Sequence, residues 1–228
     1  MTLADVSKVE AGSLGVVPIR VDLTSTDTMS QLEISNTSEE ASFVQVTAIE
    51  WVSPDSIAHG KMATSLLVVP PIFDLDPGRT QLVRLAHRGP VAGAMERTYR
   101  LLIQEVPKTA GLVPNTVTVA AQMNLPVFVT PEGAAPSPGW EIRGDAARVP
   151  SLAIVNEGTA YISVKTLKLL AADLERPVFE TNAGGVVFAG GERSWTLDAD
   201  LARLKGPFTV RAETNIGPLE ASVAFPGR

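Results

Sequence analysis

The sequence contains no cysteine, only two histidines and no long apolar run. The absence of cysteine excludes thiol catalysis, thiolate metal sites and a disulfide framework, but it is compatible with either side of a cell membrane. No stretch approaches the roughly 18 apolar residues that cross a bilayer. The net charge is -6 and basic residues are not clustered, which argues against nucleic-acid binding. We therefore expect neither membrane insertion nor a nucleic-acid partner.

Catalytic motifs are also missing. The chain has no G-x-S-x-G, no phosphate-binding glycine loop and no H-E-x-x-H. His59 and His87 have no metal-ligand partner at helical or hairpin spacing. Asp74 and Asp76 flank a predicted turn and are more typical of turn formers than of an acid/base pair. We expect no enzymatic activity, no catalytic residue, no metal site and no cofactor.

Apolar residues and turn formers are abundant instead. The chain is 45% hydrophobic and 19% charged, and its 17 prolines and 18 glycines are spread along 228 residues. Segments with period-two alternation, which is typical of half-buried strands, include SQLEISN, ASFVQVTAIEW, TQLVRLAH and RTYRLLIQEVP. About seven such strands in about 130 residues match the size and spacing of an immunoglobulin-like sandwich. The sequence thus predicts an all-β fold.

The stretch TPEGAAPSPG, residues 130–139, is rich in proline and glycine and is typical of a domain boundary. Shorter strand candidates follow it, and the apolar spacing of residues 166–175 leaves strand and helix both open. We favour a second, smaller β-sandwich. The predicted domains are residues 1–131 and 132–228.

One apolar stripe is unusually long. The segment NTVTVAAQMNLPVFV, Asn115 to Val129, carries apolar residues at every odd position from Val117 onward. Fully extended, it would span about 50 Å, whereas a typical strand has roughly 5–6 residues. The stripe therefore extends beyond what a single ordinary strand would bury.

Several segments together resemble periplasmic pilus-assembly chaperones of the chaperone–usher pathway. The matching pieces, in order, are VVPIRVDL, LEISN, VVPPIFDLDPGRTQLVRL, ERTYRLLIQEVP and LPVFVTP. The pieces YRLLIQEVP and LPVFV resemble the archaic (alternative) branch. The resemblance implies two immunoglobulin-like β-sandwich domains arranged as an L. It also implies a periplasmic protein whose signal peptide is absent from this mature chain.

In this family the stripe would be a donor strand that fills the open groove of an incomplete pilus subunit, a form of β-augmentation. The resemblance makes Val117, Val119 and Ala121 donors, with Met123 as a fourth, and returns Leu125 onward to the chaperone's own core. It also implies three forms of association: capture of a pilus or fibre subunit, delivery to an outer-membrane usher, and possible self-association through the exposed strand edge. The alternative is a structural or adhesive immunoglobulin-like surface protein whose whole odd face packs inside the first domain.

The resemblance also assigns a role to Arg20, which would grip the C-terminal carboxylate of the subunit through its guanidinium fork. The alternative is a solvated arginine on an edge strand. The family's second anchor, a lysine late in the donor strand, is missing, because the nearest positions are Asn124 and Pro126.

Two further expectations come from the same resemblance. Glu96 matches the acidic member of an interdomain charge network, but Thr130 stands where its basic member would be. The bond Val69–Pro70 is expected to be cis, although only about 5–6% of X–Pro bonds are.

Overall fold

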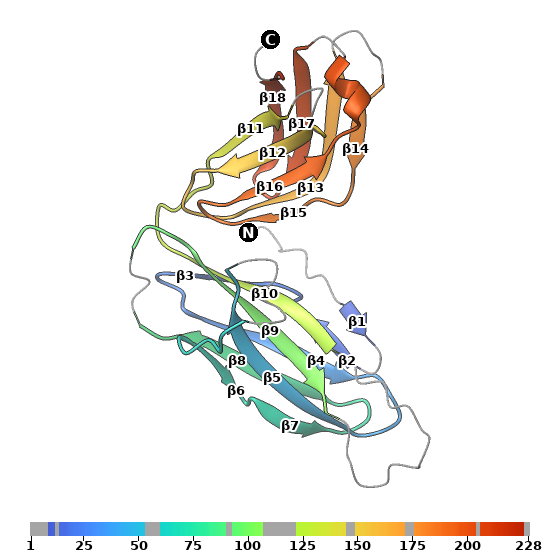
Figure 1. Ribbon diagram of the computed structural model, residues 1–228. Coiled ribbons are helices and arrows are strands. Elements are labelled where there is room, and N and C mark those ends of the chain that lie inside the picture. Colours follow the sequence, from blue (N-terminus) through green and yellow to red (C-terminus); the bar gives the residue numbers. More distant parts are fainter. Residues whose placement is uncertain are drawn as a thin grey trace. The chain divides into compact units, whose positions relative to one another are not determined.

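The computed structural model describes residues 9–11, 14–52, 60–89, 93–106, 122–144, 149–171, 176–203 and 206–225. In these ranges the chain forms strands and one short 3-10 helix, η1 (Ala199–Arg203), so the all-β prediction is confirmed (Figure 1). No helix in these ranges is long and apolar enough to span a bilayer.

The chain divides into two compact units. The first comprises Met1–Gly93 and Arg97–Glu132, and the second comprises Ala94–Glu96 and Gly133–Arg228. The three residues Ala94–Glu96, just before β9, therefore belong with the second unit. A single boundary along the chain cannot reproduce this division.

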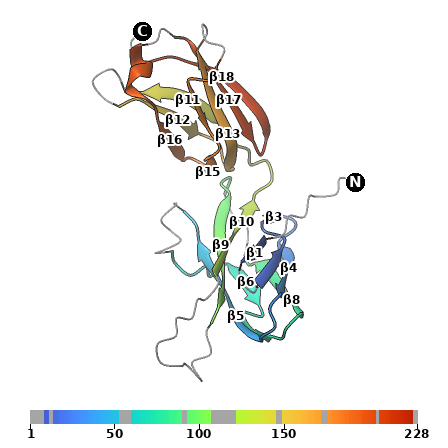
Figure 2. The same cartoon turned by 90° about the vertical axis from the view of Figure 1, so that its right-hand side faces the viewer.

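The first unit is a sandwich of two sheets (Figures 1 and 2). One sheet has the order β1-β2-β4-β8-β6 and the other β3-β10-β9-β5-β7. The strands are β1 (Val9–Ala11), β2 (Leu14–Val17), β3 (Val21–Thr24), β4 (Met29–Asn36), β5 (Ser42–Glu50), β6 (Leu66–Val69), β7 (Ile72–Leu75), β8 (Thr80–His87), β9 (Arg97–Glu105) and β10 (Gln122–Thr130).

The second unit is a smaller sandwich. Its sheets have the orders β11-β12-β16 and β14-β13-β17-β18, and β15 pairs with β13. The strands are β11 (Pro138–Arg143), β12 (Ser151–Asn156), β13 (Ile162–Ala171), β14 (Phe179–Thr181), β15 (Gly185–Val187), β16 (Glu192–Thr196), β17 (Phe208–Thr214) and β18 (Gly217–Val223). Because β13 extends to Ala171, the helical alternative is wrong for residues 166–171.

Alternation builds the core of the first unit, since successive side chains of a strand point to opposite faces. The buried cluster draws from both sheets and includes Leu32, Ile34, Val44, Val46, Val83, Leu85, Leu101 and Ile103. A separate cluster fills the second sandwich. The predicted cis bond at Val69–Pro70 is confirmed, and Val17–Pro18 and Gly206–Pro207 are cis as well.

A buried asparagine closes the same kind of loop in both units. Asn36 ends β4 and Asn156 ends β12, with 1% and 0% of their surface exposed. The amide nitrogen of Asn36 donates to the carbonyl groups of Glu40 (2.6 Å) and Leu75 (2.9 Å). The same short motif, Leu-x-Ile-x-Asn, precedes both loops.

Asn156 makes the denser set of contacts. Its oxygen accepts the N–H groups of Ser137 (3.0 Å) and Gly158 (3.1 Å). Its amide nitrogen donates toward the carbonyl oxygens of Ala160, Val187 and Phe188. One side chain thus satisfies backbone groups from three loops, which would otherwise be buried without partners.

We expect Asn156→Ala to lower the free energy of unfolding of the second unit by about 2–4 kcal/mol, because buried backbone groups would lose their partners. Denaturant titration would measure this, with Trp140 and Trp195 as fluorescent reporters in the second unit. Asn215→Ala is the control: its exposed side chain accepts one hydrogen bond from Ser163 (2.7 Å), so a loss of under about 1 kcal/mol is expected. Equal losses would contradict the assignment.

A second prediction concerns His87, which is 6% exposed. Its Nε2 shares a hydrogen bond with the Tyr99 hydroxyl (3.1 Å), which also bonds Ser65 (2.8 Å). Its Nδ1 is buried without a partner. In the charged form both nitrogens carry hydrogen, and one would have no acceptor. Burial and the nearby charge of Arg97 both lower the pKa of His87.

A lowered pKa in the folded state means that the unfolded chain binds the proton more readily. Stability is therefore unaffected well above pH 6.5 and falls as the pH drops below it, by up to about 1.4 kcal/mol per pH unit. Denaturation of His87→Gln between pH 7.5 and 5 should show a smaller pH slope than the natural chain. Parallel slopes would rule out His87 as the source.

Candidate functional site

The candidate site begins with the pairing of β10. This strand runs antiparallel to β9 along Gln122–Val129. On its other edge it pairs with β3, in parallel, only from Val127 to Thr130. Over Gln122–Pro126, no described strand pairs with that second edge. The half of β10 that continues the apolar stripe therefore has an open edge within the described part of the chain.

The side chains of β10 divide by parity. Leu125, Val127 and Val129 are buried in the core of the first unit, which confirms the expectation that the stripe returns to the unit's own core at Leu125. Met123 belongs to the same cluster and is 5% exposed. Its side chain therefore lies in the unit's own core, and its role as a donor stays a prediction.

The other predicted donors, Val117, Val119 and Ala121, lie outside the described residues, as does His59. The stripe keeps one parity from residue 117 to 129. In the described part of the strand, the odd-numbered residues from Met123 to Val129 all lie in the core of the first unit.

Arg20 lies just before β3, on the outer face of the sheet. Its guanidinium donates to both carboxylate oxygens of Asp22, with N···O distances of 2.7 to 3.0 Å. The two side chains remain 42% and 52% exposed. The guanidinium also lies 5.3 Å from the ring centre of Phe128. Arg20 is thus held by an acidic neighbour and an aromatic ring of its own unit.

A row of four side chains extends from this point across the sheet. The rings of Phe128 and Trp51 lie 6.1 Å apart, and the guanidinium of Arg100 lies 3.5 Å from the ring centre of Trp51. We call Arg20, Phe128, Trp51 and Arg100 the arginine–aromatic row. Phe128 and Trp51 are 1% and 5% exposed although they lie outside the core cluster. A cation over a ring face is attracted by the ring quadrupole.

Arg100 is the less hydrated end of the row. It lies on β9 directly opposite Pro126 of β10. Its Nη1 donates to the carbonyl of Asn124 at a long 3.5 Å, and its Nε is buried without a partner. Loss of water around the guanidinium lowers the pKa of Arg100 to about 10, so it remains charged at neutral pH.

Glu96 belongs to the second unit. Its carboxylate accepts the N–H of Tyr161 (3.1 Å), and its own N–H donates to the carbonyl of Thr159 (2.8 Å). With 9% of its surface exposed, Glu96 fastens the segment Ala94–Glu96 to the second sandwich through backbone groups.

Sequence reasoning did not place Arg100 against Trp51. One signal was available: in RTYRLLIQE, alternation places Arg100 and Leu102 opposite to the buried Tyr99 and Leu101. A charge in the middle of such a strand marks its outer face. The partner ring, Trp51, could not be assigned, because it follows the end of β5 and its position depends on how β5 pairs with β9.

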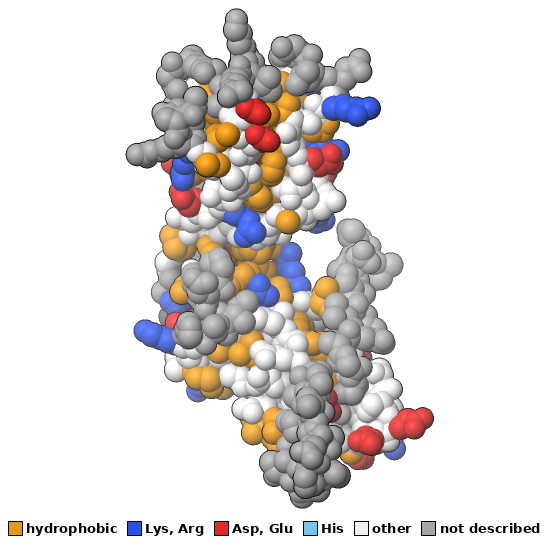
Figure 3. Space-filling view, turned by 45° about the vertical axis from the view of Figure 1, so that its right-hand side comes forward, with side chains coloured by type: hydrophobic (Ala, Val, Ile, Leu, Met, Phe, Trp, Pro, Cys, Tyr) orange, Lys and Arg blue, Asp and Glu red, His pale blue; other side chains and the backbone are white. Residues whose placement is uncertain are grey.

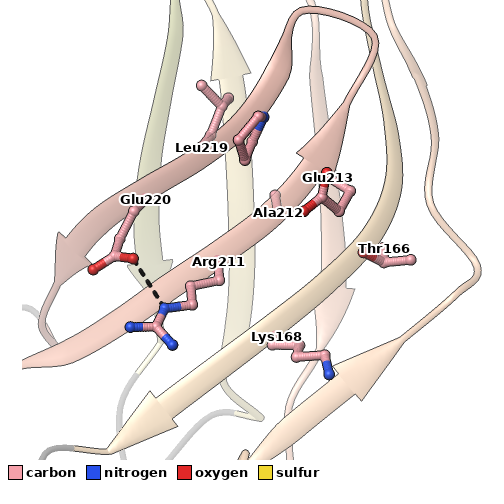
Figure 4. Close-up of a pocket in the computed structure, with 8 residues that line it drawn as sticks. Thr166, Lys168, Arg211, Ala212, Glu213, Leu219 and Glu220 are labelled. Carbon is pink, nitrogen blue, oxygen red and sulfur yellow. Dashed lines mark hydrogen bonds and ion pairs between the residues drawn. The ribbon is translucent and has the colours of Figure 1, made fainter.

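The outer surface of the second unit offers a different environment. A hollow of about 520 Å³ lies over β13, β17 and β18 (Figure 4). Its two basic lining residues are paired, Arg211 with Glu220 of the lining and Lys168 with the neighbouring Glu180, both at 2.9 Å. Figure 3 shows hydrophobic side chains interspersed with single basic and acidic ones on one face of the molecule. We assign no function to this hollow.

Comparison with known proteins agrees with this architecture. Residues 13–135 match the family described as pili and flagellar-assembly chaperone, PapD N-terminal domain. The probable fimbrial chaperone protein ElfD of Escherichia coli (strain K12) is 27% identical over 127 residues, which are 54% of this chain and 52% of that protein. The matched part thus spans about half the length of the curated relatives.

Solved structures share the fold over nearly the whole chain. A chain of the CsuC–CsuE chaperone–tip adhesion subunit complex, from archaic Csu pili of Acinetobacter baumannii, has a TM-score of 0.67 at 15% identity and covers 94% of this chain and 99% of its own. The E. coli chaperone DraB has a TM-score of 0.67 at 20% identity, covering 93% and 97%. At these identities the likeness establishes the fold, a two-domain immunoglobulin-like sandwich.

The family match covers more than half of the chain and includes β10, β9 and the arginine–aromatic row. The chain therefore belongs to the pili and flagellar-assembly chaperone family, by its PapD-type N-terminal domain.

Proposed function

We propose that this protein is a periplasmic chaperone that binds pilus or surface-fibre subunits by donor-strand complementation and delivers them to an outer-membrane usher. The observation that carries the proposal is the open edge of β10 over Gln122–Pro126, which lies within the apolar stripe. An exposed strand edge offers unpaired N–H and C=O groups to another chain. A partner that lacks a strand can pair with that edge.

The physical basis is β-augmentation. Backbone hydrogen bonds supply affinity whatever the sequence, while every second side chain enters a pocket of the partner. We assign the donor role to Val117, Val119 and Ala121. Met123 is the fourth predicted donor, and in this chain it packs in the core of its own unit.

Arg20 is proposed to bind the C-terminal carboxylate of the subunit. Its guanidinium already holds one carboxylate, that of Asp22, through two nitrogens, which is the fork geometry that suits a chain terminus. The ring of Phe128 would contact the guanidinium through its face, as a cation–π contact. The terminal carboxylate of a subunit would either bind Arg20 alongside Asp22 or displace the Asp22 carboxylate from it.

Structural neighbours support the choice of partner. Two of them are described as complexes of a chaperone with a subunit, CsuC with a tip adhesion subunit and SafB with the SafA pilin of Salmonella enterica. The motifs YRLLIQEVP and LPVFV favour the archaic branch for this chain. Family membership supports the periplasm as its compartment and an usher as the recipient of the subunit.

The overall test is co-expression with the subunit encoded beside this chain's gene. We expect the subunit to be recovered only as a 1:1 complex and to be degraded or aggregated when expressed alone. A surface or adhesive protein without donor activity would instead be recovered as a stable single species, and the subunit would be unaffected by its presence.

A pair of variants tests the donor face. Val119→Glu should leave the chain folded and soluble but abolish subunit capture, because a carboxylate without a partner in the subunit groove costs several kcal/mol. Thr118→Glu, on the opposite face, is the matched control and should retain capture if that face is wet. Circular dichroism and co-purification measure the two properties. Unfolding of Val119→Glu would assign this face to the chain's own core and overturn the donor role.

Arg20→Ala tests the carboxylate contact. The side chain is exposed, so the variant should fold normally. Loss of a charge-assisted contact should weaken subunit binding by roughly 1.5–3 kcal/mol, or about 10- to 150-fold in dissociation constant. Asp22→Asn is the control, since it removes the competing carboxylate and should not weaken binding. Full recovery of complex with Arg20→Ala would show that Arg20 does not anchor the subunit.

A further inference from the structure

The pairing of β9 fixes which residues of β10 direct their backbone groups toward the open edge. At the two ends of the β5–β9 ladder, the N–H of Val106 donates to the carbonyl of Phe43 (2.8 Å) and the N–H of Trp51 donates to the carbonyl of Thr98 (2.9 Å). The direction of backbone groups alternates along a strand in an antiparallel ladder. The even-numbered residues of β9 therefore bond toward β5, and the odd-numbered residues face β10.

The same alternation continues into β10. Leu101 lies opposite Leu125, and Ile103 lies opposite Met123. Leu125 and Met123 consequently direct their N–H and C=O groups toward β9, whereas the even-numbered residues of β10 direct theirs toward the other edge. Over Gln122–Pro126 that edge has no described partner strand.

Pro126 is the exception among these even-numbered residues, because a proline has no backbone N–H. Prolines are accepted within a sheet where the missing donor faces an unpaired edge, which agrees with the direction deduced from β9. The next residue, Val127, lies opposite Val21 at the start of the β3 ladder. Asn124 therefore carries the last N–H that the open edge offers before β3 takes over.

This gap limits where a partner strand can pair. A shift of one residue would turn the partner's side chains to the wrong face, but a shift of two residues keeps every face as it was. The alternating apolar pattern therefore does not exclude the two-residue shift. A partner shifted toward β3 would place one of its carbonyl groups against Pro126, where no N–H is present, and an unmade backbone bond is unfavourable.

We propose that Pro126 is a positioning residue that fixes the register of the captured strand, by ending its pairing with β10 at Asn124. This inference rests on the proposed function and adds to it the selection of one register among those that the apolar stripe allows. Pro126 acts through a hydrogen bond that it does not offer, so its effect depends on the backbone of the residue and not on the side chain.

The direction of the backbone groups is tested first, by amide hydrogen exchange of the full chain, free and in complex with the subunit encoded beside it. In the free chain the amides of Gln122 and Asn124 should exchange at least about tenfold faster than those of Met123 and Leu125, because they face the open edge. Capture should slow Gln122 and Asn124 to the level of their neighbours. Equal exchange of all four amides in the free chain would overturn the inference.

The register itself is read by disulfide cross-linking. The chain has no cysteine, so Gln122→Cys, at an exposed position of β10, introduces a unique thiol. Single cysteines are placed at successive positions of the subunit's pairing strand, since directly opposed side chains lie about 4.5–5.5 Å apart. In the natural background one subunit position should predominate.

Pro126→Ala restores the missing N–H. We expect the cross-link two subunit positions away to rise roughly two- to tenfold relative to the main one, the worth of one backbone hydrogen bond. Pro126→Thr restores the same N–H with a side chain that favours strands and should give the same shift. Thermal unfolding of each free variant identifies a folding defect, and agreement between the two variants excludes a side-chain effect.

Pro218→Ala is the matched control, because Pro218 is an exposed proline on β18, a strand at the edge of a sheet in the second unit. This variant should leave the cross-linking pattern unchanged. A shift as large as that of Pro126→Ala would show that the effect is not specific to β10 and would overturn the role of Pro126.

The outcomes separate this inference from the function beneath it. If the subunit is captured but both variants of Pro126 keep the natural register, the donor strand stands and the positioning role is wrong. If Val119→Glu captures subunit normally and the subunit leaves the exchange of Gln122 and Asn124 unchanged, the proposed function itself fails.

Discussion

Every backbone N–H and C=O of an extended strand needs a partner, and over Gln122–Pro126 the described chain supplies partners along only one edge of β10. The other features of the site follow from this constraint. β9 fixes the strand on one side, and β3 takes up the remaining edge only from Val127 onward. The point where β3 begins therefore decides how much of β10 is left for another chain.

The two arginines on the outer face of the β10 sheet, Arg20 and Arg100, each lie against an aromatic ring. Phe128 and Trp51 are almost fully buried on a face that does not belong to the core, and each has an arginine against it. One of these arginines is neutralised by Asp22 and the other is not. The row is thus electrostatically uneven, with its less hydrated charge beside β10.

The return of Leu125 to the core was implied by the family resemblance. Period-two alternation was sufficient to predict the all-β fold, because it reports directly on strand faces. The same pattern could not decide whether Met123 faces a partner's groove or the chain's own core, since both are apolar. Arg100 on Trp51 could not be paired without the registers of β5, β9 and β10. Asn36 and Asn156 share the motif Leu-x-Ile-x-Asn, but the motif does not say which loops close over them or which backbone groups they satisfy.

The placement of Ala94–Glu96 has a consequence for how the protein can be divided. Glu96 is hydrogen-bonded to Thr159 and Tyr161, so neither sandwich corresponds to one uninterrupted piece of sequence. A fragment ending at Glu132 would carry the Glu96 carboxylate without the amide that it accepts from. The complementary fragment would leave the Thr159 carbonyl and the Tyr161 amide bare. Domain swaps between relatives would therefore need to transfer this tripeptide together with the second sandwich, although it is encoded ahead of β9.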